Sequence, residues 1–253
     1  MKELHMYLHK SILIACTVFL FQSVSFSQTG KEILQKMDNN RKYSFMEYSS
    51  TMEIHIGDEV RTKTMKAKAL TKSGRKAFVE FVNTEDQGTK YLMLDNNLWI
   101  YFPDENDVVK ISGHMLKEGM MGSDVSYEDA LASDELSDKY DVSVLSDEKI
   151  NDHLCYVLQL DAKVKDVPYQ KRKMWVDKES YVSLKEEMYA KSGKLLKESN
   201  VIEMKKVDGR NVPVKVQMVN KLRKNSKTIF TMTDIVFDKA IPEEVFTMRY
   251  LQR

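Results

Sequence analysis

His153 and Cys155 are two residues of this chain whose types and spacing could do chemistry together. One residue separates them in an apolar run, so on a strand both side chains lie on the same face. Such a pair could share a metal ion or form a thiolate pair. Tetrahedral metal sites need about four ligands, and no third ligand lies near this pair in the sequence. We therefore predict that Cys155 is a buried free thiol that packs as a small apolar side chain.

Other patterns of catalytic or ligand-binding residues are missing from the sequence. It contains no Cys-x-x-Cys or His-Glu-x-x-His spacing, no Gly-x-Ser-x-Gly turn and no glycine-rich phosphate loop. The acidic run Asp104-Glu105-Asn106-Asp107 lacks the glycine and alternating spacing of a calcium loop, so it indicates a hairpin turn. We expect no cofactor, no metal and no enzymatic activity. An acid–base pair formed by residues distant in sequence is the one route left open.

The N-terminus is typical of a secretory signal. Lys2 and Lys10 are followed by an apolar run over residues 11–21, and small residues precede Gln28, which predicts a signal peptide over residues 1–27. The apolar run is short for a membrane span, which needs about 20 residues. An alternative is a lipid-modified Cys16, but its preceding apolar run would be very short. We therefore expect export to the periplasm of a Gram-negative cell, with lipidation at Cys16 as the second choice.

The charge balance disfavours a nucleic-acid binder. The chain carries a net charge of +1, and removal of Lys2, Lys10 and Glu3 with the signal peptide leaves basic and acidic residues in equal number. A nucleic-acid-binding domain would carry a clear basic excess. Neither the charge nor a heptad pattern gives a reason to expect a stable oligomer, so we expect a monomer without a nucleic-acid partner.

Most of the chain has the period of two that is typical of β-strands. Thr29 predicts the cap of a helix over residues 30–40, and the alternation begins near Tyr43. Short polar turns separate strand-like runs at residues 60–72, 75–83, 89–95, 98–102, 107–112, 140–145, 153–162, 169–177, 183–189, 195–206, 212–222 and 228–237. This meander predicts one mainly β (α+β) domain over residues 28–253: an incomplete antiparallel β-barrel, or strongly curled sheet, with short helices on its concave face.

A helical insert interrupts the meander at residues 113–138. Its first part carries several methionines, and Ser126 predicts the cap of a short helix over residues 127–132. The concave face of the sheet is the obvious place for the insert to bury its apolar side, so we expect a mobile lid. We expect Asp124 to form an ordinary turn and cap, with a hydrogen bond that holds the lid closed as the alternative.

One predicted strand is apolar on both of its faces. Trp99 and Tyr101 share one face, and Leu98, Ile100 and Phe102 share the other. Both faces must therefore be covered. One cover is the core, and the other is either the insert or a bound lipid.

Several motifs carry a resemblance to a known family. They are Trp99-x-Tyr101-x-Pro103, Gly113-His114-Met115, Met121-Gly122-Ser123-Asp124 with Tyr127-x-Asp129, and a closing segment with Ile241-Pro242, Phe246-Thr247 and Arg249-Tyr250-Leu251. With these residues the chain resembles the LolA-like outer-membrane lipoprotein-sorting proteins, in an exported and more distant branch. The resemblance implies an incomplete barrel with a hydrophobic cavity between the sheet and its covering helices, and a carrier of acyl chains.

Methionine is abundant, with 16 in the whole chain. An unbranched, polarizable side chain suits a surface that repacks around varied ligands, although methionine also fills irregular cores. The candidate ligand contacts in the cavity and lid are Met52, Ile54, Leu92, Leu94, Trp99, Tyr101, Met115, Leu116, Met120, Met121, Met174 and Met188. The candidate lid turn is Gly122-Ser123-Asp124.

These observations together predict a periplasmic carrier. It would bind the acyl chains of lipoproteins or lipids and deliver them towards the outer membrane, with an inner-membrane transporter and an outer-membrane acceptor as partners. Two alternatives stay open. The protein could be a membrane-tethered acceptor lipidated at Cys16, or a non-transporting, lipid-sensing accessory subunit of an envelope lipid-export complex.

Overall fold

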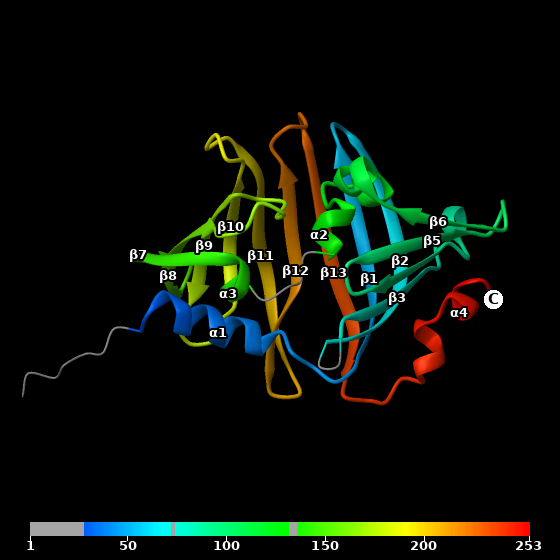
Figure 1. Cartoon of the computed structure of the whole chain (residues 1–253), viewed down its shortest axis with the longest axis horizontal. Coiled ribbons are helices and arrows are strands. Elements are labelled where there is room, and N and C mark those ends of the chain that lie inside the picture. Colours follow the sequence, from blue (N-terminus) through cyan, green and yellow to red (C-terminus); the bar gives the residue numbers. More distant parts are fainter. Residues whose placement is uncertain (1–27, 72–73, 132–135) are drawn as a thin grey trace, which may run out of the picture.

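The polypeptide forms one long antiparallel sheet that curls into an open half-barrel (Figure 1). The computed structural model describes residues 28–71, 74–131 and 136–253. The predicted signal peptide and Cys16 lie outside these residues. Within them, no helix has both the length and the apolar character needed to cross a membrane.

Thirteen strands follow the order β6-β5-β4-β3-β2-β1-β13-β12-β11-β10-β9-β8-β7. We call β1 to β6 the first half-sheet; its strands are β1 Met46–Ile56, β2 Glu59–Leu70, β3 Lys76–Phe81, β4 Lys90–Leu94, β5 Asn97–Phe102 and β6 Asp107–Ile111. We call β7 to β13 the second half-sheet; its strands are β7 Tyr140–Ile150, β8 His153–Ala162, β9 Lys171–Asp177, β10 Ser183–Tyr189, β11 Leu195–Val207, β12 Arg210–Asn220 and β13 Ser226–Phe237. The mainly antiparallel, incomplete barrel predicted from the sequence is confirmed.

Short helices lie on both sides of this sheet. They are α1 Gly30–Asn40, η1 Thr84–Asp86, η2 Gly113–Lys117, η3 Met120–Gly122, α2 Tyr127–Leu131, α3 Leu136–Lys139, η4 Glu243–Phe246 and α4 Met248–Leu251, where η marks a 3₁₀-helix. The helix predicted from Thr29 is confirmed with its bounds. Thr29 accepts a hydrogen bond from the backbone N–H of Glu32, and Glu32 accepts one from the backbone N–H of Thr29, which forms a complete capping box.

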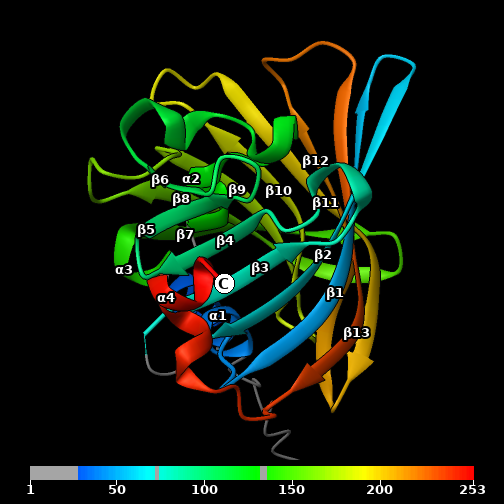
Figure 2. The same ribbon diagram turned by 90° about the vertical axis from the view of Figure 1, so that its right-hand side faces the viewer.

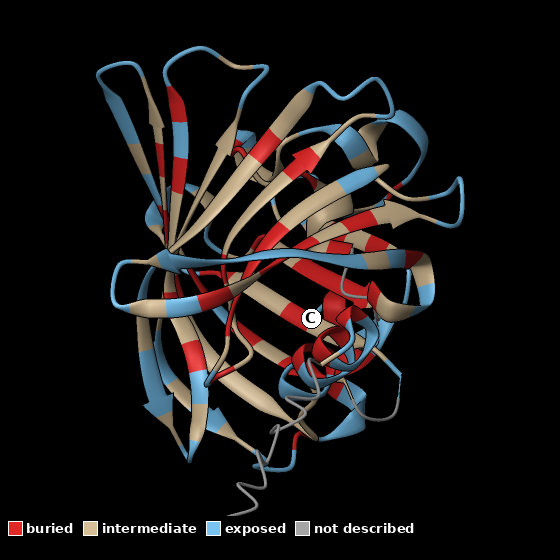
Figure 3. Cartoon of the chain, turned by 90° about the vertical axis from the view of Figure 1, so that its left-hand side faces the viewer, coloured by how far each residue is buried: buried red, intermediate tan, exposed pale blue. Residues whose placement is uncertain are grey.

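Helix α1 covers the concave face of the second half-sheet. Its apolar stripe of Ile33, Leu34 and Met37 is buried with α3 and strands β7 to β9. These three residues recur at the spacing of one helix face, so the amphipathic pattern places them against the sheet. Strand β7 forms the edge of this half and is largely exposed beyond Tyr140 (Figure 3).

The first half-sheet is covered on both faces, as the doubly apolar strand β5 requires. The described part of the insert, residues 113–131 and 136–138, lies on the concave face, whereas η4 and α4 lie on the outer face of β3, β4 and β5 (Figure 2). Leu98 and Ile100 face the insert, while Trp99 and Tyr101 face the C-terminal helices. The second cover of β5 is therefore the C-terminal segment.

Candidate functional site

The insert connects two strands that lie at opposite edges of the sheet. Strands β6 and β7 follow each other in the chain but are separated by the full width of the half-barrel, so the insert crosses its concave side. Gly119 permits the tight path of this connection, because a Cβ atom there would lie 2.1 Å from the carbonyl oxygen of Ser123. Larger residues at this position would displace the backbone of the insert.

An apolar contact joins the insert to the first half-sheet. The side chains of the insert that are partly buried against this face are Met115, Leu116, Met120, Met121, Tyr127 and Ala130, and Leu131 is buried in the same cluster. The sheet side of the contact consists of fully or nearly fully buried residues: Met52, Ile54, Met65, Phe81, Tyr91, Met93, Leu98, Ile100 and Ile111. The insert therefore covers apolar side chains of this sheet face.

Asp124 fixes the middle of the insert to the second half-sheet. Its carboxylate is fully buried and accepts hydrogen bonds from the hydroxyls of Ser226, at 2.7 and 2.8 Å, and Thr228, at 2.9 Å. It also accepts a bond of 3.2 Å from the backbone N–H of Asn220. The expectation of a plain turn and helix cap was wrong, because Asp124 bonds to the sheet and Ser126 caps α2. That these bonds hold a lid closed stays a prediction. Carboxylates can be buried in this way when their oxygens are satisfied.

Helix α2 has a separate polar attachment. The cap predicted at Ser126 is present, since its hydroxyl accepts from the backbone N–H of Asp129 at 3.3 Å. Asp129 also forms a buried ion pair with Lys197 of β11 and accepts a hydrogen bond from the hydroxyl of Tyr169. The ring of Tyr169 lies near the guanidinium of Arg172, which pairs with Glu186.

Two arginines bind carbonyl groups of the insert. The Nη1 atom of Arg223 donates to the carbonyl oxygens of Gly122 and Ser123, both at 2.9 Å. Arg75, which precedes β3, donates from Nη2 to the carbonyl oxygen of Ala130 at 3.0 Å. Since Ala130 lies in the last turn of α2, the guanidinium also interacts favourably with the negative end of the helix dipole. Polar groups from both half-sheets therefore hold the insert.

Two cavities border the insert. One has a volume of about 520 Å³ and is lined mainly by polar groups, among them Lys117, Asp124, Lys197 and Arg223. The other has a volume of about 470 Å³, and its wall combines apolar side chains with lysines. The apolar face of the first half-sheet is filled by the insert itself, so the implied large hydrophobic cavity is not open in this arrangement.

His153 and Cys155 do not form a reactive pair. The Nδ1 atom of His153 lies 3.2 Å from the carboxylate of Asp177. Burial, with a further contribution from Asp177, raises the pKa of the Cys155 thiol to about 11. The thiol is therefore protonated at neutral pH. In the part of the chain that the structure describes, His, Cys, Asp and Glu side chains form no cluster able to hold a metal ion.

Comparison with known proteins agrees with this architecture. A model of an uncharacterized protein family matches residues 73–253. A DUF1329 family protein from Desulfovibrio piger is 25% identical, with a TM-score of 0.82 over 88% of this chain and 97% of that one. A proposed outer membrane lipoprotein-sorting protein domain from Vibrio parahaemolyticus is 28% identical, with a TM-score of 0.79 over 88% and 98%. The chain belongs to the LolA-like family.

The fold of this LolA-like protein has a further solved parallel. A LolA superfamily protein from Nitrosomonas europaea shares 24% identity and a TM-score of 0.70, over 88% of this chain and 100% of the other. No curated protein matches the chain.

The residues predicted to contact ligand fall into three groups in this LolA-like fold. Met52 and Ile54 lie under the insert, in the same cluster as the predicted contacts Met115, Leu116, Met120 and Met121. Met174 and Met188 are buried in the second half-sheet, where Met174 packs in the α1 cluster. Met188 is the register partner of Lys197, so it faces the same side as the ion pair with the insert.

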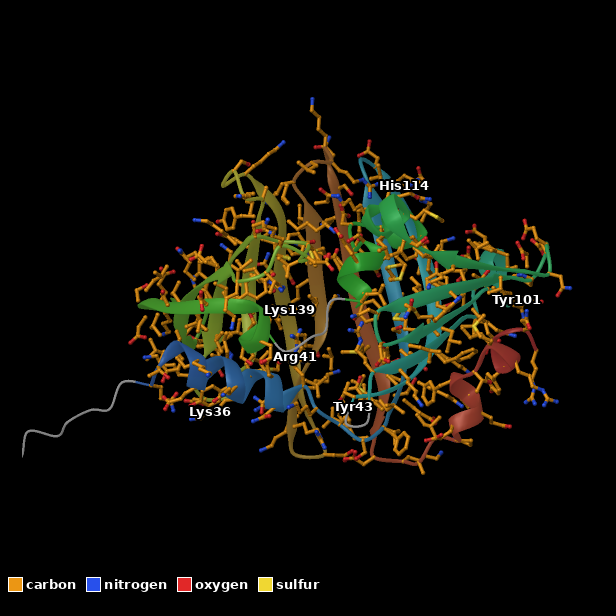
Figure 4. All side chains as sticks on the ribbon, viewed as in Figure 1. Lys36, Arg41, Tyr43, Tyr101, His114 and Lys139 are labelled. Carbon is orange, nitrogen blue, oxygen red and sulfur yellow. The ribbon has the colours of Figure 1, made fainter. Side chains whose placement is uncertain are left out.

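The third group lies on the opposite face of the first half-sheet. Leu92, Leu94, Trp99 and Tyr101 pack with the C-terminal helices, and Figure 4 shows Tyr101 beside them while His114 lies on the insert. The structure does not bring these four residues together with the insert. A ligand contact stays a prediction for all twelve residues.

The sequence does not identify the residues that anchor the insert. Lys197, Ser226 and Thr228 lie in strands whose alternation shows two faces without showing which one meets the insert. Tyr169 and Arg75 lie just before strands and carry no local motif. Only their contacts with Asp124, Asp129 and Ala130 in the folded chain reveal their role.

Proposed function

We propose that this LolA-like protein is a periplasmic carrier that binds the acyl chains of lipoproteins or lipids on the apolar face beneath the insert and carries them towards the outer membrane. The observation that supports it most directly is the contact between the apolar residues of the insert and the buried apolar residues of the sheet face. An acyl chain can replace such a contact with one of the same kind, because each buried CH₂ contributes about 0.8 kcal/mol in either case.

The polar anchors suit the release of cargo. Hydrogen bonds and ion pairs hold the insert at Asp124, Asp129 and Ala130, so its position does not depend on apolar contact alone. When the acyl chain leaves, the insert returns to these partners and covers the apolar face again. Binding is therefore an exchange between insert and ligand, which keeps the affinity moderate. Similarity to the lipoprotein-sorting domain from Vibrio parahaemolyticus supports the same reading.

Substitution of Met121 tests the proposal. Met121 lies in the left-handed region at a φ of 53°, a conformation that aspartate adopts more readily than most residues. Met121→Asp therefore places a charge in the apolar contact without new backbone strain. Met248→Asp is the matched control, since Met248 is 37% exposed and begins α4 on the outer face.

The readout is native mass spectrometry with lipid extraction, on protein purified gently from its own cell envelope. We expect co-purified lipid or lipoprotein with the parent and with Met248→Asp, and its loss with Met121→Asp while both variants keep the parent melting temperature. A parent protein that carries no lipid and takes up no fluorescent fatty acid would contradict a carrier function. Unfolding of Met121→Asp alone would make Met121 an ordinary core residue.

A further inference from the structure

Gln28, the residue before the cap of α1, contacts two tyrosines of the second half-sheet through its side chain. Its amide oxygen Oε1 accepts hydrogen bonds from the hydroxyl of Tyr181, at 3.1 Å, and from the hydroxyl of Tyr156, at 3.4 Å. Tyr156 lies in β8 and Tyr181 in the turn between β9 and β10, and both rings pack against the cluster beneath α1. Two O–H donors from separate segments therefore converge on one amide carbonyl.

Lys36 of α1 sets the direction of one of these hydrogen bonds. Its Nζ atom lies 3.0 Å from the hydroxyl oxygen of Tyr181 and 4.6 Å from the centre of that ring, and Figure 4 shows Lys36 on α1. An ammonium group only donates, so the oxygen of Tyr181 accepts from Lys36 and its own proton is left for Gln28. The bond from Lys36 also lowers the pKa of Tyr181. A more acidic hydroxyl is a stronger donor.

This arrangement has a chemical meaning because Gln28 is the first residue after the predicted signal peptide. The α-amino group of an N-terminal glutamine can reach the amide carbon Cδ of its own side chain and close a lactam ring. As the nitrogen attacks Cδ, negative charge develops on Oε1, which is the atom that Tyr156 and Tyr181 contact. Donors aimed at such an oxygen lower the barrier to attack on a carbonyl group.

We propose that removal of the signal peptide before Gln28 creates an N-terminus that modifies itself, in which Tyr156 and Tyr181 promote the cyclisation of Gln28 to pyroglutamate. The lone pair of the α-amino nitrogen forms the new bond to Cδ, and the bond between Cδ and Nε2 breaks. Nε2 takes the proton that the α-nitrogen gives up and leaves as ammonia. The inference goes beyond the proposed carrier function and does not depend on it; it depends on the predicted cleavage site.

The surroundings of Gln28 also favour the cyclised product. A free N-terminus would place an ammonium group just before α1, where the helix dipole disfavours a cation, and in the same cluster as Lys36. The carboxylate of Glu32 already accepts a hydrogen bond from the backbone N–H of Thr29. The lactam is neutral, and its carbonyl oxygen is still an acceptor for the two tyrosine hydroxyls.

The test follows cyclisation in the whole mature chain. A leader that ends in a factor Xa site is placed before Gln28, so that cleavage releases this residue as the N-terminus, and intact-mass spectrometry follows the loss of ammonia with time. Because both donors are partly exposed, we expect the folded parent to cyclise only about tenfold faster than Tyr156→Phe/Tyr181→Phe. Tyr101→Phe is the matched control, since its hydroxyl bonds to Asn106 in the first half-sheet, and it should match the parent.

Denaturing urea removes the arrangement without any substitution. In urea the parent, the double variant and the control should all cyclise at one slow rate. Far-ultraviolet circular dichroism and melting temperature show that each variant has folded in buffer, and Tyr181→Phe alone replaces the double variant if that variant does not fold. Equal rates for the folded parent and the tyrosine variant, or a parent that cyclises no faster in buffer than in urea, would overturn the proposal.

The exported protein provides an independent measurement. We expect protein purified from its own cell envelope to begin at Gln28, to lack one ammonia by intact mass and to resist Edman degradation. A mature chain that begins at another residue, or that keeps an uncyclised glutamine, would overturn the inference. The carrier function would then still stand, because it is measured separately by lipid content.

Discussion

Asp129 of the insert and Lys197 of β11 form an ion pair that is buried at both ends, with 9% of each side chain exposed. The two residues are 68 positions apart in the sequence, so the pair exists only when the insert lies on the folded sheet. Ser126 and Tyr169 supply further hydrogen bonds to Asp129. A buried pair of this kind specifies one position for the insert more than it adds stability, because desolvation offsets most of the attraction.

Lys197→Ala should lower the free energy of unfolding by about 3 kcal/mol, because it leaves the Asp129 carboxylate buried without its cation. Urea denaturation measures the change. The double variant Lys197→Ala/Asp129→Ala should lose less than the sum of the two single variants. Lys194→Ala is the control at an exposed position of the turn before β11. Additive losses would show that the pair is not coupled.

Asp124→Ala should also cost about 3 kcal/mol and should loosen the insert. The change leaves the hydroxyls of Ser226 and Thr228, which are 7% and 1% exposed, without their acceptor. Limited proteolysis should then cut within the insert faster than in the parent, whereas Asp138→Ala, at an exposed position of α3, should leave the cleavage rate unchanged. Equal cleavage of the two variants would contradict the anchor.

Phe246→Ala should show that the outer face of the first half-sheet contributes to stability and not to lipid binding. Phe246 is buried in the outer cluster with Leu92 and close to Trp99, so its truncation should cost about 3–4 kcal/mol in urea denaturation. Lipid content of the protein that remains folded should match the parent. If the variant is fully folded and has nevertheless lost its lipid, Leu92 and Trp99 would belong to the ligand site after all.

Glu128→Gln should stabilise the protein at neutral pH. Burial and the neighbouring Asp129 raise the pKa of the Glu128 carboxyl, while Lys197 and Lys117 oppose the shift. Between the ordinary and the raised pKa the folded state binds more protons than the unfolded state, so the unfolding free energy falls as pH rises through that window. The variant should therefore have a higher free energy of unfolding than the parent above this pH window, and the same free energy of unfolding below the ordinary glutamate pKa.

Thermal unfolding at those two pH values measures this difference. The charged groups around Glu128 in the cavity are Lys117, Lys139, Lys165, Asp166 and Arg172. Glu118→Gln, at an exposed position of the same insert, is the control and should show no such dependence. A Glu128→Gln variant that is stabilised equally at both pH values would contradict the assignment.

The strand meander was predictable because its signals are local. Turn residues and the period of two gave nearly every strand, and the structure differs mainly where β7 continues to Ile150 through a polar stretch. The polar residues of that stretch lie on an exposed edge, so no apolar alternation marks them. The parity of Met52 and Ile54 placed them on the apolar face of their strand, and the fold shows that this face lies under the insert.

The parts that could not be predicted depend on contacts between distant residues. Strand β5 is apolar on both faces, so its pattern does not distinguish the face under the insert from the face under Phe246. Asp124 has the sequence context of an ordinary turn, and its partners Ser226 and Thr228 are 102 and 104 residues away. Burial of a carboxylate is decided by those partners alone.

The pairing of β1 with β13 has a consequence for how the chain folds. All other pairings in the sheet join strands that are consecutive in sequence. The two half-sheets can therefore form as independent sets of hairpins. Among the described strands, the β1–β13 ladder, from Met46 opposite Phe237 to Ile56 opposite Ser226, is the one pairing that must close a loop of more than half of the chain. Since non-local pairing slows folding, the joining of the two half-sheets should be the slow step. The insert receives its complete set of partners only after that step.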